Sequence, residues 1–127
     1  MNKENLKGIT ALLVHAANID EIYTEKEKKI IKSFISSFSY NDTECEIILQ
    51  KAEQLESNSN QLFNYTSLIK KESLEVKTEV IEHLWKIIIS DQSVDQYESN
   101  LMRRICGLIY FSDKLSGDIK LKLLNQQ

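Results

Sequence analysis

The sequence contains no proline and only three glycines, Gly8, Gly107 and Gly117, in 127 residues. Proline and glycine shape the tight turns of β-rich proteins and interrupt helices, so their scarcity argues against a fold built from strands. Apolar residues instead recur at the three- and four-residue spacing of a helix face, and short polar stretches separate these segments. We therefore predict an all-α fold, a compact bundle of six helices with a short seventh near residues 116–124.

Long hydrophobic runs are also absent. The most apolar stretch, LWKIII at residues 84–89, belongs to a segment that we predict to be the central, most buried helix. It is far shorter than the ~20 apolar residues that a membrane-spanning helix requires. The first residues mimic a signal peptide only superficially, because Glu4 lies among the lysines and His15 interrupts the apolar stretch. We expect no export signal and no membrane span, and any association with a membrane would be peripheral, through a partner.

A surplus of positive charge is missing as well, since 16 Lys and Arg residues stand against 19 Asp and Glu residues, for a net charge of −3. A nucleic-acid-binding protein needs a basic surface to neutralise the phosphate backbone. We therefore expect no nucleic-acid partner.

Cysteine is limited to Cys45 and Cys106, which are far apart in the sequence and lie at apolar-face positions. This placement favours two buried free thiols over a disulfide, a metal-binding pair or a nucleophile. Buried free thiols suit the reducing cytoplasm, where we expect the protein to act. The length of the chain is that of one ordinary domain, so we predict a single domain over residues 1–127.

The common catalytic motifs do not occur in this sequence. It has no glycine-rich phosphate loop, no Gly-x-Ser-x-Gly and no Cys–His nucleophile signature. His15 and His83 do not form the Glu-x-x-His motif of helical di-iron proteins, and we interpret both as packed or solvated residues. Trp85 lies on an apolar stripe, which favours a place in the core. We expect no enzymatic activity, and a metal-dependent enzyme is the least favoured function.

Two segments share an acidic pattern. They are NIDEIYTEKEKKIIKSF at residues 18–34 and ISDQSVDQYESNLMRRI at residues 89–105. When the two segments are overlaid, three pairs of polar residues match at the same helix–loop–helix junction. These pairs are Asp20 with Asp91, Thr24 with Asp95, and Glu27 with Glu98.

Helix capping explains part of this pattern. The second and third pairs fit the capping box, in which two side chains satisfy backbone N–H groups at the start of a helix. Capping does not explain Asp20 or Asp91, because each ends an apolar helix and places negative charge near the negative pole of that helix. A hard cation would offset this charge, since carboxylates that flank a short loop supply several oxygen ligands. Both interpretations, a cation site and capping alone, remain open at this point.

The two segments resemble the TerB family of tellurite-resistance proteins. The family shows an apolar helix that ends in Asp, followed seven residues later by a Glu that opens the next helix, once near each end of an all-α chain. ALLVHAANIDEIYTEKEKKII at residues 11–31 is similar to the first copy, and LWKIIISDQSVDQYESNLMRRICGLI at residues 84–109 to the second. The resemblance covers residues 6–112 and implies a helical bundle, with a role in stress response or tellurite resistance and no known catalysis.

The resemblance also implies a divalent-cation site, for Ca²⁺ or Mg²⁺, between two acidic loops that lie near each other. The residues carried over are Asp20, Glu27, Asp91, Asp95 and Glu98. The glycine that usually follows each Asp in the family is Glu21 in the first loop and Gln92 in the second, and glycine permits backbone conformations that other residues adopt at a cost. We expect a non-catalytic protein that acts through an unidentified protein partner. The alternative is a structural interaction module whose acidic loops only cap helices.

Overall fold

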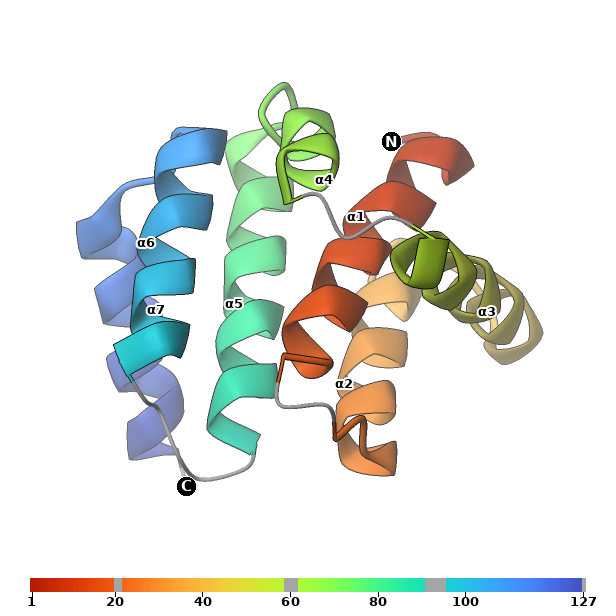
Figure 1. Cartoon of the computed structure of the whole chain (residues 1–127), viewed down its shortest axis with the longest axis horizontal. Helices are drawn as coiled ribbons and strands as arrows, with labels where there is room; N and C mark the ends of the chain where they lie inside the picture. The colour runs from red at the N-terminus through yellow and green to blue at the C-terminus, as the bar shows by residue number, and fades with distance from the viewer. Residues whose placement is uncertain (20–21, 59–61, 91–95, 127) are drawn as a thin grey trace.

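The computed structural model describes residues 1–19, 22–58, 62–90 and 96–126, and for residues 62–63 and 96–98 it describes the backbone alone. All regular secondary structure in these ranges is helical, which confirms the predicted all-α class (Figure 1). The helices are α1 (Lys3–Ala17), α2 (Glu25–Ser36), α3 (Asp42–Asn58), α4 (Leu62–Ile69), α5 (Leu74–Ser90), α6 (Gln96–Ile109) and α7 (Asp113–Asn125). The last helix is longer than the short seventh helix predicted near residues 116–124.

Polar residues at the predicted breaks start several of these helices. The side chains of Asn2, Thr24 and Ser112 accept hydrogen bonds from backbone N–H groups in the first turns of α1, α2 and α7. Asn41 and Ser73 do the same for α3 and α5. The cap at Ser112 explains why α7 begins earlier than predicted, because a capped Asp113 is a favourable first residue of a helix.

Two helices, α1 and α5, form the centre of the bundle. They pack against each other, α2, α3 and α4 contact α1, and α2, α6 and α7 contact α5 (Figure 1). The prediction that α5 is central is confirmed, but the prediction that it is the most buried helix is wrong. α1 has ten buried residues and α5 has eight. Neighbouring helices cover α1 on several sides, including a face that carries small or polar residues such as Gly8 and Thr10, so its buried face is wider than its apolar spacing alone indicates.

The predictions made for three core residues are confirmed. Cys45 and Cys106 are free, buried thiols, as predicted. Trp85 is buried in the core, also as predicted, and its indole N–H donates a 2.9 Å hydrogen bond to Oγ of Ser116. This bond joins the middle of α5 to α7. In the ranges that the structure describes, every helix is too short or too polar to cross a lipid bilayer.

Gly8 permits the close packing of α1 against α4. A Cβ atom at this position would overlap the side chain of Leu68. With any larger residue at position 8, the partly buried side chain of Leu68 would have to move away from α1.

Candidate functional site

The five carboxylates predicted as metal ligands are only partly covered by the described structure. Glu27 is described in full, at the start of α2. Asp20, Asp91 and Asp95 lie outside the described residues, and for Glu98 the described part is the backbone in α6. The described part of the site consists of Glu27 and the residues that flank the two acidic loops.

Glu27 forms the predicted capping box with Thr24. Its backbone N–H donates to Oγ1 of Thr24 at 3.1 Å, and its Oε1 accepts from the Thr24 backbone N–H at 2.8 Å and from the Thr24 hydroxyl at 3.0 Å. Glu27 is only 5% exposed, which is unusual for a carboxylate. The capping role predicted for this position is confirmed.

The environment of Glu27 is rich in negative charge. The hydroxyl of Tyr23 is buried and has no hydrogen-bond partner of good geometry among the described residues. Burial raises the pKa of Tyr23, and the nearby carboxylates of Glu53, Glu27 and Glu25 raise it further. The first acidic loop is therefore followed by a partly buried cluster of oxygen atoms. The ammonium group of Lys28 already places one positive charge beside it, 5.1 Å from the centre of the Tyr23 ring and 3.7 Å from Oε1 of Glu25.

Lys26 connects the regions beside the two acidic loops. Its ammonium group donates to the backbone oxygen of Ser90 at 3.2 Å, although 64 residues separate the two in the sequence. Ser90 is the last residue of α5 and directly precedes the second acidic loop, and Lys26 lies in the first turn of α2. Figure 1 shows the end of α5 and the start of α2 at the same end of the bundle. The fold thus brings together the two segments that share the acidic pattern, residues 18–34 and residues 89–105, at Lys26 and Ser90.

The contact also identifies a role for Lys26 that the sequence analysis missed. The backbone oxygens at the end of α5 form its negative pole, and the ammonium group of Lys26 supplies positive charge there. Lys26 therefore offsets part of the negative charge at the end of α5, which the sequence analysis expected a bound cation to offset. The sequence carried only a weak signal for this role, a lysine between Glu25 and Glu27.

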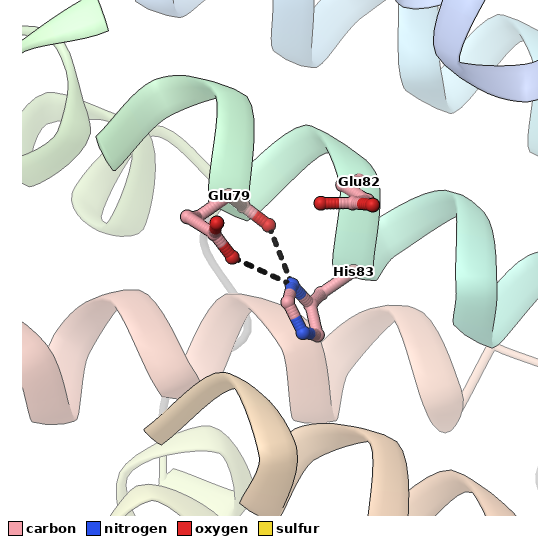
Figure 2. Close-up of side chains that lie close together, drawn as sticks. All are labelled: Glu79, Glu82 and His83. Carbon is pink, nitrogen blue, oxygen red and sulfur yellow. Dashed lines mark hydrogen bonds and ion pairs between the residues drawn. The ribbon is translucent and has the colours of Figure 1, made fainter. Parts of the chain in front are cut away.

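A second group of potential metal ligands lies on α5, and the sequence analysis did not identify it. One ligand atom each from Glu79, Glu82 and His83 lies within 4.8 Å of the others, so the three side chains could hold one metal ion (Figure 2). The signal for this group is the spacing i, i+3 and i+4, which places the residues on one helix face. Imidazole with carboxylates suits a transition metal better than Ca²⁺ or Mg²⁺.

The histidine of this group is already engaged. Figure 2 shows both marked contacts of His83 ending on the same ring nitrogen: Nδ1 lies 2.8 Å from the backbone oxygen of Glu79 and 3.5 Å from its carboxylate. Nδ1 must carry the proton that the carbonyl oxygen accepts, so Nε2 is free to accept from the hydroxyl of Ser33, 3.4 Å away. His83 is 4% exposed and its ring packs edge-on against Phe34. These contacts fit the packed histidine that was predicted, and a metal ion would have to displace the Nδ1 hydrogen bond.

Comparison with family models places the chain in a known family. Residues 7–121 match the family model described as tellurite resistance protein TerB. No curated protein and no solved structure matches the chain. The matched region is nearly the whole sequence and includes all five carboxylates of the predicted site.

Proposed function

The chain belongs to the TerB family of tellurite-resistance proteins, and from this premise we propose that it is a non-catalytic stress-response protein that binds a divalent cation. The ion would be held between the two acidic loops, and the protein would act on a protein partner. We further propose that residues 1–127 work as one domain in the cytoplasm, a reducing compartment that suits the two free thiols.

The contact between Lys26 and Ser90 is the observation that carries this proposal. Ser90 and Asp91 are consecutive, and Glu27 follows Lys26, so the contact holds the flanks of both acidic loops at one place in the bundle. A site assembled from two loops requires this proximity. The residues that would hold the ion are Asp20, Glu27, Asp91, Asp95 and Glu98.

The chemistry of these ligands supports a hard cation. All five side chains are carboxylates, and Ca²⁺ and Mg²⁺ prefer oxygen ligands. The buried carboxylate of Glu27 adds negative charge beside the first acidic loop. Bound there, the ion would neutralise the loop carboxylates and stabilise the end of α5 beside the start of α2.

A structural interaction module is the second candidate, and two observations favour it. The Thr24–Glu27 capping box gives Glu27 a role that needs no ion, and Lys26 supplies positive charge at the end of α5 without one. In this case the acidic loops serve helix capping and solvation, and the protein acts through a helix face alone.

Thermal unfolding of the metal-stripped protein with Ca²⁺ or Mg²⁺ separates the two candidates. An ion at 100 times its dissociation constant stabilises the folded state by ~2.7 kcal/mol, which raises Tm by several degrees in a domain of this size. We expect this rise in the wild type and its loss in Asp91→Asn and Glu98→Gln.

Two further variants serve as controls. Glu75→Gln removes an exposed carboxylate in the first turn of α5, at the other end of this helix from the second acidic loop, and should keep the response, as should Glu79→Gln, which disables the group on α5. A Tm that does not change with millimolar Ca²⁺ or Mg²⁺, with Glu98→Gln lowering it under all conditions, would establish the capping role in place of the cation site.

A further inference from the structure

The helices α5, α6 and α7 line a groove that is open to solvent, and α6 and α7 lie on the opposite side of α5 from α1 (Figure 1). The volume of the groove is about 560 Å³, within the range of sites that bind ligands or peptide side chains. The floor consists of buried residues from each helix, namely Trp85, Met102 and Ser116. The Trp85–Ser116 hydrogen bond fixes this floor.

The walls of the groove carry an excess of positive charge. Arg103 of α6 and Lys120 of α7 line it, together with one carboxylate, Asp113. The ammonium group of Lys120 lies 5.1 Å from the centre of the Trp85 ring, which holds this charge over the floor. Neither Arg103 nor Lys120 forms an ion pair with any residue that the structure describes. A local cationic site on a protein with net charge −3 is suited to an acidic ligand.

Gly117, in the interior of α7, also lines the groove. Glycine inside a helix costs ~1 kcal/mol relative to alanine. At Gly8 the close contact with Leu68 explains why a glycine is present despite this cost. A Cβ atom at Gly117 would meet no atom within 4 Å. Packing among the described residues therefore gives no reason for a glycine here. A glycine in a groove wall lets another backbone approach closely.

An exposed apolar stripe continues from the groove along α7. Leu121 is 59% exposed and Leu124 is 38% exposed. Residues 117, 121 and 124 have the spacing of one helix face. The open glycine and the two leucines therefore form one face of α7 that the described part of the chain leaves exposed, with Lys120 beside it.

We propose that the groove between α6 and α7 binds an acidic amphipathic helix of a protein partner. The carboxylates of this helix pair with Arg103 and Lys120, its backbone crosses α7 at Gly117, and its apolar side chains cover Leu121 and Leu124. Helices that dock into grooves use apolar residues at i, i+3, i+4 and i+7 in this way. The inference rests on the protein-partner part of the proposed function and is independent of the cation site.

The test is a selection of displayed peptides of about 16 residues, with helical amphipathic pattern and randomised polar positions, on the full-length protein. We expect enriched peptides to be rich in Asp and Glu. Fluorescence anisotropy would then measure the affinity of one enriched peptide and of the same peptide with every Glu changed to Gln. The neutral peptide should bind roughly tenfold more weakly, and binding of the acidic peptide should weaken with added salt.

Variants of the protein locate the binding site. Gly117→Leu adds a side chain to the groove wall at a position where a Cβ atom meets no atom within 4 Å, and it should reduce peptide affinity roughly tenfold, since its side chain occupies the crossing point. Gly107→Leu is the matched control, because a Cβ atom there also meets nothing within 4 Å and Gly107 does not line this groove. Lys120→Glu should abolish binding of the acidic peptide and allow binding of the same peptide with Lys in place of Glu.

Several results would overturn the proposal: no enrichment, enrichment of peptides without acidic residues, or affinity that is equal for wild type and Gly117→Leu. A dimer of the wild type that Gly117→Leu dissociates would also overturn it, because a second copy of the chain would then occupy the groove. The measurement is repeated on Asp91→Asn and in the presence of a chelator. Peptide binding that persists there shows that the groove functions even if the cation site fails, and an ion response without peptide binding shows the reverse.

Discussion

The ammonium group of Lys26 lies 3.2 Å from the backbone oxygen of Ser90, and this contact joins the first turn of α2 to the last residue of α5. It places positive charge at a helix C-terminus, where it is favourable. The same contact holds the flanks of the two acidic loops together.

Removing this charge should destabilise the protein slightly. We expect Lys26→Met to lower the free energy of unfolding by about 0.3–1 kcal/mol, because the carbonyl oxygens at the end of α5 lose their counter-charge. Urea unfolding at low salt measures the change. Lys29→Met is the control, because Lys29 is an exposed lysine of the same helix that makes no such contact with the residues that the structure describes. Equal effects of the two substitutions would show that the contact contributes nothing.

Loss of the Ser116 hydroxyl should lower the free energy of unfolding more than Lys26→Met does. In Ser116→Ala the indole N–H of Trp85 stays buried and loses its acceptor, which costs about 1–3 kcal/mol. Denaturant unfolding followed by the fluorescence of this single tryptophan gives the value. Ser67→Ala, which removes an exposed hydroxyl bonded only within its own helix, should change stability little.

Substitution by alanine at Gly8 and at Gly117 should change the stability of the protein in opposite directions. Gly8→Ala forces a Cβ atom against Leu68 and should destabilise by about 1–3 kcal/mol. Gly117→Ala meets no neighbour and should stabilise by up to ~1 kcal/mol through helix propensity. Thermal unfolding compares the two variants. Adding Leu68→Ala to Gly8→Ala should relieve the clash, and an unchanged deficit in the double variant would refute this explanation.

Stability should fall as the pH drops below the ordinary pKa of histidine. Burial is the main cause that lowers the pKa of His83 below 6.5 in the folded state, and Lys86 contributes. The unfolded chain then binds a proton that the folded chain does not, so stability is full above pH 6.5 and declines as the pH falls toward the lowered folded pKa. Urea unfolding between roughly pH 8 and 5 should show this decline in the wild type and a smaller decline in His83→Gln. His15→Gln is the matched control, and an identical profile for His83→Gln and the wild type would disprove the assignment.

Much of the fold could be predicted from the sequence because it depends on local signals. The apolar spacing and the polar residues at Asn2, Thr24 and Ser112 specify helices and their starts through short-range contacts. The relative burial of α1 and α5 could not be predicted in the same way, because it depends on which helices cover them.

The candidate site was predictable only in part, for a similar reason. The capping role of Glu27 follows from its spacing to Thr24 and is confirmed. The contact between Lys26 and Ser90 joins residues 64 positions apart, and no local pattern encodes such a pair. The groove between α6 and α7 likewise arises from packing between helices, and no pattern in the sequence indicated it.

The central position of α1 has a consequence for how the chain reaches its folded state. Its partner α5 begins at residue 74, whereas α1 ends at residue 17, so the intervening segments must form a closed loop before the two helices meet. Contacts that are distant in sequence slow folding. Until α5 is made, α1 lacks one of the helices that cover its buried face, and a nascent or truncated chain would leave that part of the face open to aggregation and to chaperones.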